Sequence, residues 1–330
     1  MRNNYTIKKV NSPFDDTCFF IRNVYKKKAL LFDCGRIGGL NNTEILSLRD
    51  IFISHAHIDH FYGFDRLLRT FLRSDKKLRF YGPPGFINNV IGKLSGYTWN
   101  LVDNYDFELE AYELNSCGKA KIALFKASNY FKPIIYYKDN LEYLSLDDGF
   151  KVVYEFFDHS IPVIGYRIKE AIHVNIKKDV LCKYDYVPGP WLTELKARLR
   201  SNYLLSDVLE VETKDGKKRV KLGLLADQLV IFKPPQDITF ITDFAPTYEN
   251  YSKAITFASN SYILLIESMF LKKDILHAID KSHSTTSLSK QIFLESGSKF
   301  VHFFHFSSKY EKSKDEFMYC IYKDIDKKII

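Results

Sequence analysis

The chain has 330 residues, of which 46% are hydrophobic and 27% charged, a composition that is ordinary for a folded globular protein with a substantial core. Its net charge of +8 is compatible with a polyanionic partner such as nucleic acid, and equally with a surface that is merely rich in lysine. The five cysteines form no C-x-x-C pair, and we find neither a signal peptide nor an apolar run near the roughly 20 residues that span a bilayer. We therefore expect a cytoplasmic protein with free thiols, and exclude a disulfide framework, a thiolate zinc site and a membrane partner.

Short apolar strands broken by turns fill the amino-terminal half. Residues 18–23 (CFFIRN) and 29–35 (ALLFDCG) are typical of strands. Residues 48–55 (LRDIFISH) predict a third, whose consecutive apolar residues indicate a strand covered on both faces. Residues 60–74 carry apolar side chains at helical spacing, and residues 78–94 predict a strand, a Pro/Gly turn and a helix. Tyr97 and Trp99, which follow, are interpreted as core packing rather than as a base-stacking platform.

The carboxyl-terminal half continues the alternation of strands and helices. Residues 150–168 predict two strands around a turn, and the apolar runs 238–244 and 261–270 each reach acidic residues near their ends. Residues 285–296 predict a helix and residues 299–308 a final strand. Strands interleaved with helices in this way predict the α/β class, in which helices cover sheets.

One segment, residues 171–221, differs from the rest of a chain that we otherwise expect to be a single domain over residues 1–330. It contains eleven Lys/Arg against seven Asp/Glu, a Pro-Gly-Pro break at 188–190 and a predicted β-hairpin at Asp215-Gly216. Two interpretations remain open: an ordinary surface insertion, or a protruding basic arm that contacts a polyanion.

Residues 52–65 (FISHAHIDHFYGFD) hold the clearest chemical signal. His55 and His57 alternate after a strand and can point to the same side, while Asp59 and His60 begin the next helix. Imidazole and carboxylate without thiolate suit zinc, manganese or iron in a hydrolytic site. Four ligands are one too many for a single catalytic zinc, so the motif predicts two divalent metal ions about 3.5–4 Å apart.

The remaining ligands of such a site must come from other strand ends. His159, Asp243 and His305 each follow a predicted strand, although an isolated histidine or aspartate in that position is often structural. Four histidines remain. Three of them are interpreted as structural, surface or core residues (His302, His173, His277). The fourth, His283, is considered below.

Several motifs in order resemble a known fold and family. SHAHIDH resembles the signature of the metallo-β-lactamase fold, a four-layered αββα sandwich, and LLFDCG is similar to its first motif. HSIPVIGYRI, VPGP, ITDF, IESMF, SHSTTS and HFFHFSSKY then follow in the order found in the ribonuclease Z family, endonucleases that trim the 3′ ends of tRNA precursors. The resemblance spans about residues 20–310.

The resemblance implies roles for individual residues. It places one metal on His55, His57 and His159, and the other on Asp59, His60 and His305, with Asp243 bridging them and Asp33 supporting the metal loop. It implies catalytic roles for Asp59, Glu267 and His283, of which the last two would assist proton transfer to the leaving group. It also implies substrate contacts by Lys309 and by the tip of the arm (Pro188, Gly189, Pro190), zinc as the metal with Mn²⁺ or Fe²⁺ as alternatives, an RNA substrate and a homodimer.

Outside the ligand positions the chain departs from the family pattern. Asp243 is preceded by Thr242 and followed by Phe244 where the family has Gly-Asp-Thr, and Lys309 stands where the family has arginine. Lysine keeps the charge but not the bidentate phosphate contact of arginine. These departures affect the expected substrate more than the expected chemistry.

Three hypotheses for the function follow, two of them enzymatic and the third non-catalytic. The first is a metal-dependent endonuclease for tRNA precursors, in which two cations sharing Asp243 lower the pKa of a water and His283, oriented by Glu267, acts as general acid. The second is a phosphodiesterase for a small substrate such as a cyclic nucleotide, and the third is a non-catalytic RNA-binding or scaffold protein. Both proton-transfer residues also have plainer interpretations: His283 as a helix cap or surface residue, and Glu267 as a strand-end salt bridge.

Overall fold

A computed structural model describes residues 5–323 and 325, without 25–27, 140, 142, 146–150, 202–203 and 324. It divides into two compact units, the first formed by Met1–Lys169 with Gln236–Ile330 and the second by Glu170–Pro235. The second unit therefore contains the segment 171–221 and continues beyond it. No helix among the described residues is long and apolar enough to cross a membrane.

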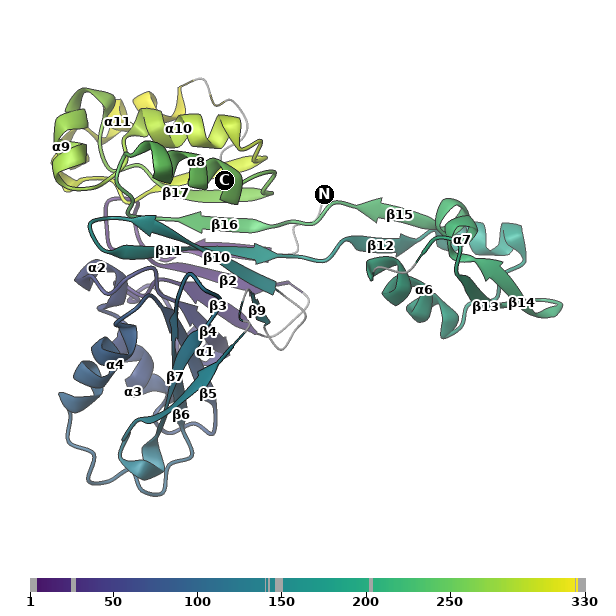
Figure 1. Ribbon diagram of the computed structural model, residues 1–330, viewed down its shortest axis with the longest axis horizontal. Helices are drawn as coiled ribbons and strands as arrows, with labels where there is room; N and C mark the ends of the chain where they lie inside the picture. Colours follow the sequence, from purple (N-terminus) through teal and green to yellow (C-terminus); the bar gives the residue numbers. More distant parts are fainter. Residues whose placement is uncertain are drawn as a thin grey trace. The chain divides into compact units, whose positions relative to one another are not determined.

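Two sheets form the centre of the first unit (Figure 1). The first sheet has, in spatial order, β1 (Tyr5–Lys9), β2 (Phe19–Asn23), β3 (Ala29–Phe32), β4 (Leu48–Phe52), β5 (Lys77–Gly82), β6 (Glu108–Leu114), β7 (Ala120–Lys126) and β8 (Ile134–Lys138). The second has, in spatial order, β18 (Phe300–Phe304), β17 (Ile263–Glu267), β16 (Ile238–Ile241), β11 (Pro162–Lys169), β10 (Lys151–Asp158) and β9 (Leu144–Ser145).

Helices cover the outer face of each sheet (Figure 1). On the first sheet these are α1 (Asn42–Ser47), α2 (Ile58–Phe61), α3 (Phe64–Phe71) and α4 (Phe86–Ser95). On the second they are α8 (Tyr248–Phe257), α9 (Ile275–Asp280), α10 (Thr286–Glu295) and α11 (Lys314–Tyr322), with short 3₁₀ turns at Ala127–Asn129, Lys272–Asp274 and Ser308–Ser313 elsewhere in the unit. The predicted α/β class and its four layers are confirmed.

Three hydrophobic clusters separate these layers among the described residues. The apolar residues at the end of β4 are consecutive because both faces of the strand are covered. Ile51 and Ile53 pack in the cluster under the helices, and Phe52, between them in the sequence, packs between the two sheets. Between the sheets, Phe32 stacks on Phe240 with ring centroids 5.1 Å apart. The prediction that this strand is covered on both faces is confirmed.

The helix predicted over residues 60–74 is interrupted, which corrects the sequence interpretation. It is divided into α2 and α3 at Gly63, whose backbone N–H donates to the Cys34 carbonyl at 2.6 Å. A Cβ at Gly63 would lie 2.5 Å from the Gly35 carbonyl oxygen, so only glycine fits this approach. The break fixes α2 against the loop that follows β3.

The second unit has a hydrophobic cluster of its own. It contains β12 (His173–Ile176), α5 (Lys178–Leu181), a 3₁₀ turn (Cys182–Tyr184), α6 (Trp191–Arg200), β13 (Val208–Thr213), β14 (Gly216–Lys221), α7 (Leu222–Leu229) and β15 (Val230–Lys233). The predicted hairpin is present as β13–β14. Its turn lies at Lys214-Asp215, one residue earlier than expected, because Thr213 pairs with Gly216, whose φ of 112° suits glycine.

Candidate metal centre

The carboxyl ends of four strands meet at one edge of the second sheet. Strands β16, β17 and β18 are parallel, and β10 runs in the same direction because both β10 and β16 pair antiparallel with β11. His159, Asp243 and His305 follow three of these strands, and Glu267 is the last residue of the fourth. Parallel strands thus carry to one place four residues that lie far apart in the sequence.

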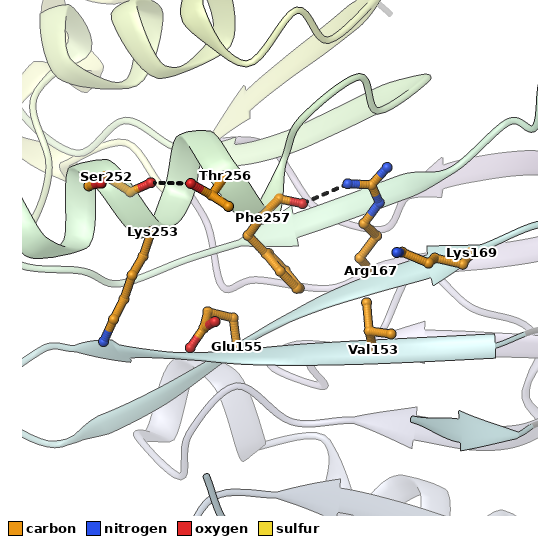
Figure 2. A pocket seen from close by; sticks show the side chains of 8 residues that line it. All are labelled: Val153, Glu155, Arg167, Lys169, Ser252, Lys253, Thr256 and Phe257. Carbon is orange, nitrogen blue, oxygen red and sulfur yellow. Dashed lines mark hydrogen bonds between the residues drawn. The ribbon is translucent and has the colours of Figure 1, made fainter. Parts of the chain in front are cut away.

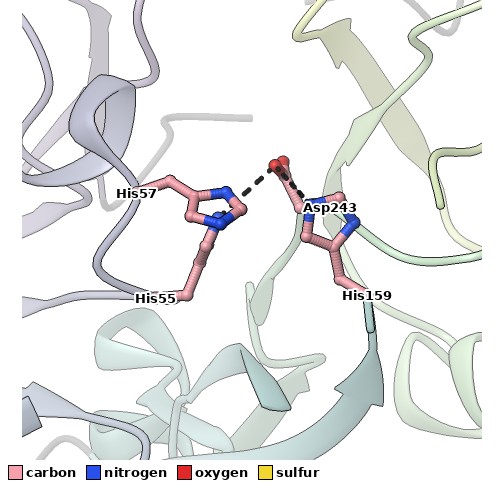
Figure 3. A group of neighbouring side chains, drawn as sticks. All are labelled: His55, His57, His159 and Asp243. Atoms are coloured by element: carbon pink, nitrogen blue, oxygen red, sulfur yellow. Dashed lines mark ion pairs between the residues drawn. The ribbon is translucent and has the colours of Figure 1, made fainter. Parts of the chain in front are cut away.

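One group of side chains combines the end of β4 with this edge (Figure 3). The potential ligand atoms of His55, His57, His159 and Asp243 all lie within 4.8 Å of one another. Asp243 Oδ2 is 3.6 Å from His55 Nε2 and 3.8 Å from His159 Nε2. His57 is the exposed member and immediately precedes α2.

A second group of side chains lies beside the first, and Asp243 of the first group contacts it. Asp59, His60 and His305 bring their ligand atoms within 4.8 Å of one another. Asp59 Oδ2 is 3.3 Å from His60 Nε2 and 3.1 Å from His305 Nε2, and Asp243 Oδ2 is 3.3 Å from His60 Nε2. The structure therefore brings together all seven residues that were predicted as metal ligands, in two groups with Asp243 between them.

Buried histidine nitrogens without hydrogen-bond partners among the described residues indicate that these groups fit a metal ion. His55 Nε2 and His60 Nε2 are buried and have no hydrogen-bond partner in the part of the chain that the structure describes. Leaving a buried polar atom unpaired costs about 1–3 kcal/mol, whereas a cation would satisfy both nitrogens. Imidazole and carboxylate donors without thiolate suit Zn²⁺, Mn²⁺ or Fe²⁺. The donor set fits a divalent metal centre.

The opposite ring nitrogens of the histidines are held by hydrogen bonds. Asp33 Oδ2 lies 2.7 Å from His60 Nδ1, and Asp33 in turn accepts from the Ser54 backbone at 2.7 Å and from its hydroxyl at 2.9 Å. The Ser54 hydroxyl is also 3.0 Å from His55 Nδ1. On the other side of the group, His159 Nδ1 donates to the Ser282 carbonyl at 2.7 Å. Each of these bonds turns Nε2 of its histidine toward the site.

Ser54 and Ser282 were not predicted from the sequence. Ser54 precedes the first histidine of the motif, and this adjacency is the only sequence signal for it. Ser282 acts through its backbone carbonyl, so its side-chain type carries no signal for this contact.

Burial and charge act in opposite directions on the histidine pKa values. Burial, together with the nearby His60, lowers the pKa of His55 well below its ordinary value. Burial would also lower the pKa of His60, but the carboxylates of Asp243 and Asp33 outweigh it and raise that pKa well above the ordinary value. In the same way Asp243 outweighs burial and raises the pKa of His305 to about 10. A divalent cation would therefore displace protons on binding.

Glu267 and His283 form a buried pair next to the metal groups. Glu267 Oε2 lies 2.9 Å from His283 Nδ1, while Glu267 Oε1 accepts from the backbone N–H groups of Phe244 and Ser284. Burial lowers the pKa of His283, but Glu267 outweighs it and raises that pKa above its ordinary value. His283 is neither exposed nor a helix cap, because Thr285 caps α10.

Other predicted residues lie outside these groups. Lys309 Nζ is 2.6 Å from Asp274 Oδ1, so a phosphate contact by Lys309, which remains a prediction, would have to replace this ion pair. The Pro188–Gly189–Pro190 turn belongs to the second unit and directly precedes α6. The interpretation of the remaining histidines and Trp99 as structural, surface or core residues agrees with ring contacts or hydrogen bonds in the structure (Trp99 with Phe131, His302 with Phe19, His277 with Phe270, His173 with Glu170). Tyr97 is 47% exposed, so its interpretation as core packing is wrong.

A cavity of about 320 Å³ lies elsewhere in the first unit, between β10, β11 and α8 (Figure 2). Its arginine, Arg167, donates to Asp237 and to the Phe257 carbonyl, each at 2.8 Å. Lys253 contacts Glu249 at 2.9 Å. The chain's own acceptors engage these two of the three cations that line the cavity, the third being Lys169. Among the described residues, the cavity brings together no group of potential metal ligands, so the histidine groups are the better candidate site.

The aspartate behind His60 gives a direct test of the metal assignment. We expect Asp33→Asn to weaken divalent metal binding about 10- to 100-fold, because the neutral amide no longer polarises His60. Competition with a chromogenic chelator measures this affinity. Asp50→Asn is the matched control, since Asp50 is a buried carboxylate of β4 that pairs with Arg79 at 2.7 Å. Equal metal affinities for the two variants would contradict the role of Asp33.

A second test concerns the glycine that packs against the metal loop. A Cβ at Gly35 would lie 2.1 Å from the Asp59 carbonyl oxygen, and that atom belongs to the backbone and cannot rotate away. We expect Gly35→Ala to lower the free energy of unfolding by about 1–3 kcal/mol and to reduce the bound metal, because Asp59 must move. Thermal unfolding and metal analysis measure both effects. Gly92→Ala is the control, because a Cβ at that exposed position of α4 meets no atom within 4 Å and should be neutral or stabilising.

Comparisons with known proteins agree with this geometry. No family model matches the chain. It is 24% identical over 300 residues to a protein named Ribonuclease Z from Deinococcus radiodurans, covering 86% of this chain and 84% of that protein. It is 29% identical over 312 residues to one of the same name from Nanoarchaeum equitans, covering 92% and 82%. The resemblance to ribonuclease Z is thus confirmed over most of the chain.

Solved structures agree on the fold. The human tRNase Z short form superposes with a TM-score of 0.51 and 16% identity, covering 92% of this chain and 93% of that one. The metallo-β-lactamase fold protein YhfI from Bacillus subtilis superposes with a TM-score of 0.50 and 12% identity, covering 92% and 86%. The chain has the metallo-β-lactamase fold.

Proposed function

We propose that this chain is a metal-dependent endoribonuclease that processes the 3′ ends of tRNA precursors. The observation that carries the proposal is the convergence of seven histidine and aspartate side chains into two groups around Asp243. The similarity to proteins named Ribonuclease Z over most of the chain supports the choice of reaction.

The two groups would hold two divalent ions, which we propose to be zinc. His55, His57 and His159 would hold one ion, and Asp59, His60 and His305 the other, with Asp243 between them. Two such ions, once bound, lower the pKa of a water molecule and stabilise the charge that develops on a phosphoryl group. Metal analysis of the purified protein tests both the number and the identity of the ions.

The chain's own residues would supply positioning and the proton. Asp33, Ser54 and the Ser282 carbonyl fix the orientation of the ligand histidines. When water attacks phosphorus and the bond to the 3′ oxygen breaks, His283 would give its proton to that oxygen, while Glu267 holds the ring in place.

The second unit is the proposed RNA-binding arm. Its hairpin strand β14 presents Lys217, Lys218, Arg219 and Lys221 as exposed residues. Lysine and arginine side chains bind phosphates of a nucleic-acid backbone irrespective of sequence. This charge favours an RNA over a small diester as the substrate.

The alternatives are separable from the proposal. A small-substrate phosphodiesterase would use the same metal groups and would not need the basic arm. A non-catalytic scaffold would have no use for buried histidine nitrogens that lack partners among the residues described, so the geometry argues against it. Incubation with a tRNA precursor carrying a 3′ trailer, and separately with bis(p-nitrophenyl) phosphate, distinguishes the three. We expect both substrates to be cut. Cleavage of the small diester alone would favour the phosphodiesterase. Cleavage of neither substrate by the metal-loaded protein would favour the scaffold.

The compartment and assembly belong to the same proposal. All five thiols are free, which supports the cytoplasm as the place of action. We also propose a homodimer, which light scattering coupled to size-exclusion chromatography tests.

A further inference from the structure

A third group of ligand atoms overlaps the metal centre. Asp243, Glu267, His283 and His305 are all buried, and their potential ligand atoms lie within 4.8 Å of one another. His305 Nδ1 is 3.5 Å from Asp243 Oδ1 and 3.6 Å from Glu267 Oε2. His283 Nδ1 lies 2.9 Å from the same Glu267 oxygen. Two imidazoles and two carboxylates thus face one point.

This group uses atoms that the other two groups leave over. Asp243 turns Oδ2 toward His55, His60 and His159, whereas its Oδ1 faces His305 Nδ1. His305 contacts Asp59 through Nε2 and leaves Nδ1 on the opposite side of its ring. An ion in the third group would therefore share residues with the metal centre but not ligand atoms.

An unpartnered nitrogen points into the third group. His305 is 8% exposed, and its Nδ1 is buried without a hydrogen-bond partner among the described residues. The neighbouring oxygens at 3.5 and 3.6 Å are too far for a good hydrogen bond but suitably placed to share a cation with it. A buried nitrogen left in this way indicates a ligand position.

The chemistry of the third group differs from that of a catalytic site. Four protein ligands of the histidine and carboxylate type form a closed set, which suits tetrahedral zinc. Catalytic zinc sites usually keep one position open for water or substrate, whereas closed sets do not. Zinc in this group would be bound without any capacity to act on a substrate.

We propose that excess zinc occupies a third, inhibitory site formed by Asp243 Oδ1, Glu267, His283 and His305 Nδ1. The inference rests on the proposed function, because inhibition requires an activity. Zinc at this site takes Glu267 and His283 out of their mutual hydrogen bond, and so removes the proton donor for the leaving oxygen. Low zinc concentrations load the catalytic positions, and higher concentrations then stop turnover.

Equilibrium dialysis against increasing zinc tests the site without relying on activity. We expect bound zinc to rise from two to three equivalents per chain between micromolar and millimolar concentrations. The rate of tRNA precursor cleavage, measured on the same samples, should fall with the same midpoint and by about 100-fold, the contribution of a general acid to the departure of the 3′ oxygen. A constant two equivalents over this range, or inhibition at concentrations unrelated to the third equivalent, would overturn the proposal.

Two variants identify the ligands through zinc content alone, since both residues belong to the proposed catalytic machinery. Glu267→Gln and His283→Ala should each lose the third equivalent and keep the first two. His277→Ala is the matched control, because His277 is an exposed histidine of α9 that packs on Phe270 outside the group, and it should bind all three. Retention of the third equivalent by both variants contradicts the assignment.

The outcomes separate this inference from the proposed function. Three bound equivalents without hydrolysis of either substrate at any zinc concentration would remove the proposed function, and the inhibitory role with it, while the metal site itself stands. Cleavage of the tRNA precursor that excess zinc does not reduce would remove the inference and leave the proposed function intact.

Discussion

Replacement of His57 by alanine should abolish hydrolysis of both the tRNA precursor and bis(p-nitrophenyl) phosphate. His57 belongs to the first metal group but is its exposed member, so its removal leaves the buried core unchanged. Loss of a metal ion forfeits several kcal/mol of transition-state stabilisation, and each 1.36 kcal/mol is tenfold in rate, so we expect at least about a 1,000-fold decrease in both reactions. Metal content, measured on the same preparation, should fall in parallel.

The control for this experiment is again His277→Ala, which removes an exposed histidine away from the metal groups and should retain both activities. If His57→Ala kept its metal and its activity on both substrates, the first group would not be the catalytic centre. If wild type cut only the small diester, the metal chemistry would stand and the RNA substrate would not.

The metal groups were largely predictable because their geometry follows from strand order. His159, Asp243 and His305 were selected as residues at strand ends, and the parallel strands β10, β16 and β18 carry all three to one edge. The local motif around His55 needed no tertiary information, because four of its ligands lie within six residues.

Contacts between distant segments were not predictable. The division of α2 from α3 depends on the close contact of Gly63 with Cys34 and Gly35, which belong to another loop. The helical periodicity of residues 60–74 does not indicate this contact. The ion pair of Lys309 with Asp274 is equally invisible in the sequence, because each residue alone suggests only a solvated charge.

Strands β6, β7 and β8 were also missed, and for β8 the reason is different. They complete the first sheet at its edge, and all five residues of β8 are exposed, including Ile134 and Tyr137. Burial therefore imposes no alternation of apolar and polar residues on β8, and the period-of-two pattern that would identify a half-buried strand is absent. The pairing register with β7 alone defines it.

Removal of most of the second unit should separate RNA cleavage from metal chemistry. Strands β12 and β15 pair antiparallel, with Ile176 opposite Val230, so a two-residue Asn-Gly turn can replace residues 177–229 and close the pair. The deletion takes out most of that unit's hydrophobic cluster and none of the residues of the other three clusters. We therefore expect the first unit to stay folded and to hydrolyse bis(p-nitrophenyl) phosphate within about twofold of the wild-type rate, since surface changes away from packed features typically cost under about 0.5 kcal/mol.

The same deletion should raise KM for the tRNA precursor by at least about 100-fold, because the phosphate contacts of the basic residues are lost. The dependence of log affinity on log salt concentration should also become shallower, by about 0.7–0.9 for each phosphate contact removed. A milder variant with Lys218 and Arg219 replaced by alanine should lie between the two proteins, since both side chains are exposed on β14. An unchanged KM and salt dependence in the deletion variant would show that RNA is bound by the first unit alone.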